Sequence, residues 1–304
     1  MRLTEISDNN PSLSALVVWS ESRRGWIKVA ELVGVNVETT TLDSVLHGAD
    51  GVNLGVIGDK LAEFERADHS YLTITKTQDV KYRPLLTPSK ILCVGLNYAG
   101  HIKEFGHGYP LEPVIFNKAP TAATYCGADI VLPPVSNRVD YEAELVVVIG
   151  RRGKRISESN ALDYVVGYCC GNDVSARDWQ KEKPSGQWFL GKSFDSFAPI
   201  GPQLVTKDEV GDPNCLKIES RLNGKVMQSA STSQFIYSVP RVISYVSQVM
   251  TLEPGDVIFT GTPDGIGDVR KPPVYLSEGD VFEVEIEKLG VLRNSVRRFD
   301  ALER

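Results

Sequence analysis

The stretch Asp140-Tyr-Glu142-Ala-Glu144-Leu-Val-Val-Val-Ile149 carries the pattern that best indicates the fold of this chain. Side chains of a β-strand alternate between its two faces, so Glu142 and Glu144 project from the same side. The uninterrupted apolar run that follows them is typical of a strand covered on both faces. The stretch therefore predicts a buried strand that starts with two neighbouring carboxylates.

A second alternating segment, FEVEIE at 282–287, provides a comparison within the same chain. Its carboxylates recur along the whole strand, which is typical of a solvated face. At Glu142 and Glu144 the alternation instead stops beside a core, where two like charges would repel each other and lose hydration. A divalent cation would offset both costs. The alternative is an exposed start of the strand.

Short β-like runs punctuated by glycine and proline continue on both sides of this stretch. Helical patterns are confined, in the larger part of the chain, to residues 157–164, 175–182 and 238–250. Many strands at short spacing indicate a sandwich or barrel-like β core with a few helices. The expected fold class is α+β, predominantly β.

The N-terminal part of the chain has a different organisation. Two apolar runs within residues 15–30 read as strands, and Asn53–Ala67 has the apolar period of a helix. Prolines and polar residues interrupt the pattern at Lys81–Lys90. We therefore expect a small α+β domain at residues 1–85 and a larger catalytic domain at residues 86–304.

Composition narrows the possible partners. The 304 residues include 33 basic and 39 acidic side chains, giving a formal charge of −6, which argues against a nucleic-acid partner. No segment has the length and hydrophobicity of a signal peptide or a membrane span. The five cysteines lack any C-x-x-C spacing, which favours a reducing compartment over a disulfide or zinc framework. A cytoplasmic protein with a small-molecule substrate is expected.

A third carboxylate follows another apolar run, in Gly171-Asn-Asp173-Val-Ser-Ala-Arg177-Asp-Trp-Gln180. One interpretation makes Asp173 a metal ligand and directs Arg177 and Gln180 towards a substrate anion. The alternative is a plain ion pair between Asp173 and Arg177, which are four residues apart. Three carboxylates without histidine or cysteine would form a hard oxygen site, suited to Mg²⁺, Mn²⁺ or Ca²⁺.

Other segments hold polar residues suited to catalysis. His101 and Glu104 are three residues apart and would share a helix face, where a carboxylate makes an imidazole a better general base. The alternative is a surface pair. Lys192, in a glycine-flanked segment, would stabilise an oxyanion or simply be solvated. Thr262 lies in a glycine-rich turn that would hold a carboxylate or serve only as a turn.

Taken together and in this order, these motifs resemble the fumarylacetoacetate hydrolase family, in particular its acylpyruvase-like and 2-hydroxyhepta-2,4-diene-1,7-dioate isomerase-like members. The resemblance covers roughly Ser89 to Val296, whereas the first 85 residues resemble only a variable extension. The matching segments are VGLNYAGHIKE (94–104), VDYEAELVVVIG (139–150), GNDVSARDWQ (171–180), GKSFDSFAPIGP (191–202), TGTPDGIG (260–267) and GDVFEVEIEKLG (279–290).

The resemblance implies the family's mixed β-sandwich roll, assembled as a homodimer. It implies Glu142, Glu144 and Asp173 as ligands of Mg²⁺ or Mn²⁺, with Ca²⁺ as a possible occupant. Leu96 departs from the family, because some acylpyruvate-cleaving members carry arginine at that position. Arg177 is then the candidate for the missing contact with the substrate carboxylate.

The resemblance also implies the roles of the remaining candidates. His101 and Glu104 match a catalytic dyad on a lid segment, and Lys192 matches a lysine near the reacting oxygens. Positions associated with substrate contacts are occupied by Arg177, Gln180 and Thr262.

The expected activity is metal-dependent hydrolysis of a C–C bond in 2,4-dioxo acids. His101 would activate water for attack on C4, leaving an enolate whose charge the cation and Lys192 stabilise. One alternative is an oxaloacetate decarboxylase or a 2-oxo-acid tautomerase that uses the same site. An alternative of another class is a non-catalytic module that binds carboxylates or Ca²⁺.

Overall fold

The structure of this chain is a computed structural model. The described residues are 1–7, 14–35, 40–48, 51–66, 72, 74–76, 80–105 and 108–300.

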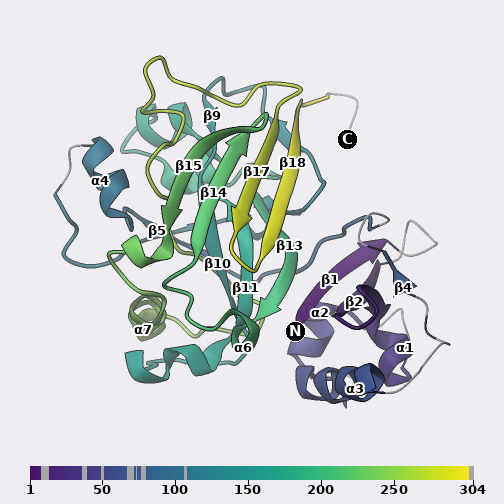
Figure 1. Cartoon of the computed structure of the whole chain (residues 1–304). Helices are drawn as coiled ribbons and strands as arrows, with labels where there is room; N and C mark the ends of the chain where they lie inside the picture. The colour runs from purple at the N-terminus through teal and green to yellow at the C-terminus, as the bar shows by residue number, and fades with distance from the viewer. Residues whose placement is uncertain are drawn as a thin grey trace.

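A mixed sheet of eleven strands, counted over the described residues, forms the centre of the molecule (Figure 1). β10 and β11 lie in its interior, and both are buried along their whole length, as the apolar runs predict. Strand β7 (Ala123–Tyr125) pairs with β13 beside the main path. The order along that path is β4 (Ile74–Thr75), β3 (Gly25–Lys28), β2 (Ser14–Ser20), β1 (Arg2–Ser7), β13 (Ala198–Thr206), β11 (Val165–Asn172), β10 (Ala143–Ile149), β16 (Val257–Phe259), β5 (Ile91–Gly95) and β6 (Val114–Lys118).

A five-stranded sheet packs over β10, β11 and β13 (Figure 1). In its strand β17 the apolar side chains face the core, whereas Glu283 and Glu285 pair with Arg221 on the other face. The alternation at 282–287 predicts this solvated face. Two packed sheets with few helices confirm the predominantly β fold. The order is β15 (Lys225–Ser231), β14 (Lys217–Leu222), β17 (Val281–Ile286), β18 (Gly290–Arg298) and β8 (Ile130–Leu132).

The N-terminal strands extend the large sheet, because β1 pairs antiparallel with β13 through Arg2↔Val205 and Leu3↔Leu204. Among the described residues of this part, three helices accompany these strands, and the longest of them buries Ile57 and Phe64 as its period predicts. The division at residue 85 stays a prediction. The helices of this part are α1 (Val29–Val33), α2 (Leu42–Leu46) and α3 (Leu54–Arg66).

The remaining helices are short, apart from α7, which begins after the capping residue Ser238. The helix predicted from residue 175 is wrong at its start. Ser175 pairs with Asp140 in a two-stranded ladder, and its hydroxyl donates to the carbonyl of Asp173, so helical geometry begins only at Arg177. These elements are β9 (Val139–Asp140), β12 (Ser175–Ala176), α4 (Ala99–Phe105), α5 (Trp188–Lys192), α6 (Lys207–Val210), α7 (Val239–Val249), the 3₁₀ helices η4 (Pro120–Ala122), η5 (Glu158–Tyr164) and η7 (Thr232–Gln234), and the π-helical turn η6 (Asp178–Glu182).

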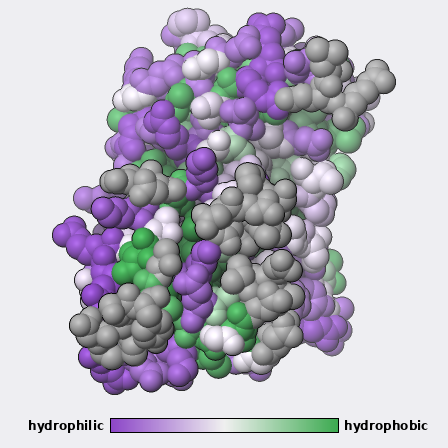
Figure 2. Space-filling view, turned by 90° about the vertical axis from the view of Figure 1, so that its right-hand side faces the viewer, coloured by the Kyte–Doolittle hydropathy of each residue, from purple (hydrophilic) through white to green (hydrophobic). Residues whose placement is uncertain are grey.

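The face that lies to the right in Figure 1 is drawn in Figure 2. Hydrophilic residues cover much of its upper part, and hydrophobic residues come to the surface in patches in its lower half. Within the described part of the chain, no helix has both the length and the hydrophobicity that crossing a bilayer requires.

Candidate active site

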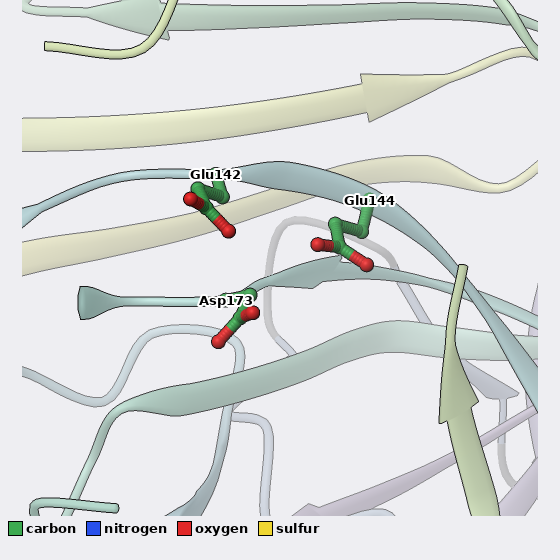
Figure 3. A group of neighbouring side chains, drawn as sticks. All are labelled: Glu142, Glu144 and Asp173. Carbon is green, nitrogen blue, oxygen red and sulfur yellow. The ribbon is translucent and has the colours of Figure 1, made fainter. Parts of the chain in front are cut away.

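The pairing of β10 with β11 brings three carboxylates together. Ala143 lies opposite Asn172, and the amide of Asp173 donates to the carbonyl of Glu142 over 2.9 Å. Alternation along the strand then places Glu144 on the same side as Glu142. One oxygen from each of the three side chains lies within 4.8 Å of the others, and all three residues are buried (Figure 3). We call Glu142, Glu144 and Asp173 the carboxylate cluster.

Two lysines neutralise part of this cluster. Lys192 Nζ lies 2.8 Å from Glu142 Oε2 and 2.6 Å from Asp173 Oδ2. Lys118, at the end of β6, pairs with Asp173 Oδ1 and donates to the carbonyl of Val174. Lys118 is not among the residues singled out from the sequence, since a lysine that ends a strand is usually solvated. Both lysines are buried, so their charges act on the cluster in a poorly screened environment.

Arg177 is held in place by two carboxylates, one of which belongs to the carboxylate cluster. Its Nη2 lies 2.7 Å from Glu142 Oε1, and its Nε donates to Asp140 Oδ2 over 2.9 Å. Arg177 therefore pairs with Asp140 and Glu142 and not with Asp173, the partner that the sequence spacing suggests as an alternative. Asp140 also accepts from the amides of Gly267 and Asp268, so it ties the arginine to the turn beyond residue 265.

Gln180 is oriented by this arginine. Arg177 Nη1 donates to Gln180 Oε1 over 2.9 Å, and a guanidinium has only donors. The amide oxygen therefore faces Arg177, which leaves the NH₂ group of Gln180 as a donor for the cavity that this residue lines.

The titration behaviour of the two glutamates differs. Burial and the charges of Asp173 and Glu142 raise the pKa of Glu144 well above its usual value. For Glu142 burial acts in the same direction, but Lys192 and Arg177 outweigh it and hold its pKa below the usual range. The nearby cations thus compensate the charge of Glu142, but they do not compensate the repulsion that Asp173 and Glu142 exert on Glu144.

The donor set fits a divalent cation. The ligand atoms are all carboxylate oxygens, the set that Mg²⁺, Mn²⁺ and Ca²⁺ prefer. The buried acidic side chains here formally outnumber the buried cations by one, so a divalent ion would leave one positive charge for a substrate carboxylate. Among the described residues, the charged groups are Asp140, Glu142, Glu144 and Asp173 against Lys118, Arg177 and Lys192.

His101 and Glu104 lie on α4, beside the cluster. His101 Nδ1 is 3.4 Å from Glu104 Oε2, and the imidazole is buried. The other oxygen of Glu104 accepts from the amide of Gly265 over 2.9 Å. The glutamate thus contacts the histidine and also anchors α4 to the glycine-rich turn.

A cavity of about 350 Å³ joins these groups. Its lining includes the polar residues His101, the two glutamates of the cluster and Lys192. It also includes the side chains of Leu96, Phe116 and Trp188, which we call the apolar wall. Leu96 stands in this wall with a φ of 56°, a left-handed conformation that is uncommon for leucine. The lining residues are Val94, Gly95, Leu96, His101, Phe116, Glu142, Glu144, Arg177, Gln180, Lys181, Trp188, Lys192 and Thr262.

Thr262 lines the cavity, and its hydroxyl already takes part in two hydrogen bonds. Its Oγ1 donates to the carbonyl of Ala143 over 3.0 Å and accepts from Gln228 Nε2 over 2.7 Å. Gln228 comes from β15 of the other sheet, and only tertiary structure reveals its contact with the site. Contact of Thr262 with a substrate stays a prediction.

Gly261 holds the cluster to the turn, because its amide donates to Glu144 Oε2 over 2.6 Å. Its φ is +99°, and an added Cβ would lie 2.7 Å from Asn97 Cβ and 3.0 Å from the carbonyl oxygen of Val94. We expect Gly261→Ala to lower the free energy of unfolding by more than the roughly 1–2 kcal/mol that a left-handed backbone costs an alanine. We also expect it to weaken Mn²⁺ binding, since the backbone shift that relieves the contact with Asn97 would move the amide that anchors Glu144. Thermal unfolding and Mn²⁺ titration measure the two effects.

Gly127→Ala is the matched control for this variant. Gly127 has a φ of +86°, and nothing lies within 4 Å of an added Cβ. Gly127→Ala should lower the free energy of unfolding by the cost of the left-handed backbone alone, and it should leave the Mn²⁺ affinity unchanged. Equal stability losses and equal Mn²⁺ affinities in the two variants would contradict the anchoring role of Gly261.

Comparisons with known proteins find similar sequences over most of the chain. A family model described as fumarylacetoacetate (FAA) hydrolase C-terminal matches residues 90–297. The fumarylacetoacetate hydrolase domain-containing protein 2 homolog of Dictyostelium discoideum is 50% identical over 229 residues, which cover 72% of this chain and 75% of that protein. The oxaloacetate tautomerase FAHD2A, mitochondrial, of Homo sapiens is 47% identical over 237 residues, which cover 78% of this chain and 76% of that protein.

A solved structure agrees with the fold over nearly the whole chain. The fumarylacetoacetate hydrolase (EaFAH) from psychrophilic Exiguobacterium antarcticum matches with a TM-score of 0.81 and 36% identity, covering 98% of this chain and 100% of that one. The matched family model, the relatives and this structure all support the resemblance inferred from the motifs. The chain belongs to the fumarylacetoacetate hydrolase family, a family of enzymes.

Proposed function

We propose that this chain is a divalent-metal-dependent enzyme that interconverts the keto and enol forms of oxaloacetate. The observation that carries the proposal is the cavity that His101 shares with Glu142 and Glu144 of the carboxylate cluster. Support comes from the 47% identity with a protein named as an oxaloacetate tautomerase. Leu96 also disfavours the acylpyruvate-cleaving subset that carries arginine at this position.

The reaction moves one proton between C3 and the oxygen on C2. His101 accepts the C3 proton at Nε2, while Glu104 beside Nδ1 stabilises the imidazolium that results. Lys192 adds positive charge where the oxygen becomes negative. When bound at the carboxylate cluster, a divalent cation supplies a Lewis acid that polarises the keto group of a chelating 2-oxo acid. The apolar wall formed by Leu96, Phe116 and Trp188 limits the access of water to these groups.

Arg177 has a positioning role in this scheme. Its guanidinium binds Asp140, Glu142 and Gln180, and the residue is only 1% exposed. It therefore sets the orientation of Glu142 and Gln180, and the NH₂ group of Gln180 is the better candidate for direct substrate contact.

The proposal is tested by the rate at which the enol absorbance of oxaloacetate changes. We expect Mg²⁺ or Mn²⁺ to support the reaction, EDTA to abolish it, and added metal to restore it. A rate that does not depend on the chelator would contradict the proposal.

Hydrolysis of 2,4-dioxo acids is the second candidate. The apolar wall suits an acyl group, and a fumarylacetoacetate hydrolase shares the fold. In this reaction the hydroxide of a water molecule adds to C4, the C3–C4 bond breaks, and C3 takes the proton. Release of pyruvate from acetylpyruvate faster than the enolisation of oxaloacetate, in one metal-loaded preparation, would favour this candidate.

Three further predictions from the sequence accompany the proposal. We propose a homodimer and a division of the chain at residue 85, for which sedimentation and limited proteolysis are the tests. A cytoplasmic location also stays a prediction, and relatives named as mitochondrial make fractionation of cells the appropriate measurement.

A further inference from the structure

The cations that line the cavity differ in what they bind. Among the described lining residues these are Arg177, Lys181 and Lys192. Arg177 and Lys192 both bind Glu142, so their charges are used at the carboxylate cluster. Lys181 Nζ instead lies 2.6 Å from Asp268 Oδ2, and its side chain is 37% exposed. Lys181 is therefore the lining cation whose charge is directed away from the cluster.

Asp268 does not depend on Lys181 for its pairing. Its Oδ1 accepts from Arg138 Nη2 over 2.9 Å and from Tyr275 OH over 2.6 Å. Both donors stay in place if Lys181 turns towards the cavity. A lysine ammonium is a point charge on a flexible four-carbon stem, so such a turn needs little rearrangement of the backbone.

Lys181 is also held at a defined place relative to the site. It follows Gln180 in η6, and Gln180 is fixed by Arg177. The amide of Asp268 donates to Asp140, the same carboxylate that binds Arg177. The lysine and its partner are thus both attached to the framework that supports the carboxylate cluster.

Another part of the lining is apolar. Its cationic neighbour, Lys192, lies 4.9 Å from the centroid of the Phe116 ring but is already paired with Glu142 and Asp173. Leu96, Phe116 and Trp188 are apolar, and the ring of Trp188 packs edge-on against Phe116 at 5.3 Å between centroids. A substrate with a second anionic group would leave that group unpaired against this wall, which is costly in a partly desolvated cavity.

We propose that Lys181 binds the second carboxylate of the substrate, so that the cavity selects 2-oxo acids that carry a further carboxylate at C4. The inference rests on the proposed function and adds the residue that sets its substrate class. The 2-oxo-acid end of the substrate lies at the carboxylate cluster, and the far carboxylate replaces Asp268 as the partner of Lys181. Asp268 keeps Arg138 and Tyr275.

The test compares Lys181→Met with Lys183→Met on two substrates, oxaloacetate and phenylpyruvate. Phenylpyruvate carries a phenyl group where oxaloacetate has its second carboxylate. Lys183 is exposed, lies over the ring of Trp179, and does not line the cavity, so it controls for loss of a nearby charge. Enolisation of both substrates is measured with saturating Mn²⁺.

We expect Lys181→Met to raise the KM for oxaloacetate about 10- to 100-fold with little change in kcat, the range typical of a hydrogen bond to a charged group. Its kcat/KM for phenylpyruvate should stay within about 3-fold of wild type. Lys181→Arg should recover part of the loss, and Lys183→Met should behave as wild type. Equal losses for both substrates would assign Lys181 a purely structural role and overturn the inference.

Calorimetric binding separates this inference from the proposed function. If the metal-loaded wild type binds oxaloacetate but does not enolise it, the proposed function fails. In that case, a selective loss of oxaloacetate affinity in Lys181→Met still supports the inference, and an unchanged affinity overturns it.

Discussion

Glu144→Gln is expected to reduce Mn²⁺ or Mg²⁺ affinity by about 100-fold or more and to abolish metal-dependent turnover. Loss of groups that only support metal ligands typically costs about 10- to 100-fold in affinity, and Glu144 is placed to be a ligand itself. The thermal stability of the metal-free variant, by contrast, should not fall. Because burial, Asp173 and Glu142 all disfavour the charged form of Glu144, a neutral side chain of the same shape removes an unfavourable charge. The metal-free variant should unfold at the same temperature as the wild type or higher.

Calorimetric metal titration and thermal unfolding of the metal-free protein measure these two effects. Glu287→Gln is the matched control, since Glu287 belongs to the alternating carboxylates of the second sheet and is exposed. It should leave metal affinity and turnover unchanged. Wild-type metal affinity in Glu144→Gln would contradict the assignment of Glu144 as a ligand.

His101→Gln is expected to lower kcat for enolisation by about 10²- to 10⁴-fold, the range that a positioned general base contributes. Metal affinity should stay at the wild-type value, because His101 is not among the clustered carboxylates. Loss of CO₂ from oxaloacetate needs no proton abstraction from C3, so any decarboxylase activity should largely survive. Parallel assays of enol absorbance and CO₂ release measure the two reactions.

His47→Gln controls for loss of an imidazole elsewhere, since His47 is exposed and its Nδ1 lies 2.8 Å from the carbonyl oxygen of Asp43, far from the cavity lining in sequence. It should not change either rate. A fall of both reactions by the same factor in His101→Gln would show that the histidine acts on binding or on structure and not as the base.

The proximity of Glu142 and Glu144 could be predicted from a local pattern, whereas the place of Asp173 beside them was left open by the residues and came from the family resemblance. Alternation placed Glu142 beside Glu144, and the end of an apolar run marked Asp173. Both patterns depend on strand geometry, which short sequence segments determine well. The pairing of β10 with β11 adds only the register that sets Asp173 next to Glu142.

The cations around the cluster could not be assigned in the same way. Lys118 lies on a strand that is distant in the sequence, and its burial depends on the packed core. Arg177 has Asp173 as its local partner by spacing, but it binds Asp140 and Glu142 instead. Long side chains choose among charges that only tertiary structure brings near. Lys181 was not singled out for the same reason.

The join between β1 and β13 has a consequence for any attempt to work with the catalytic part alone. Removing the first 85 residues would uncover the edge of β13 that now pairs with β1, including the amide of Thr206, which donates to the carbonyl of Met1 over 2.9 Å. A bare sheet margin of this kind recruits strands from other molecules and promotes aggregation. The N-terminal segment therefore covers the open edge of the large sheet, and a chain without this segment would need another element over that edge to avoid aggregation.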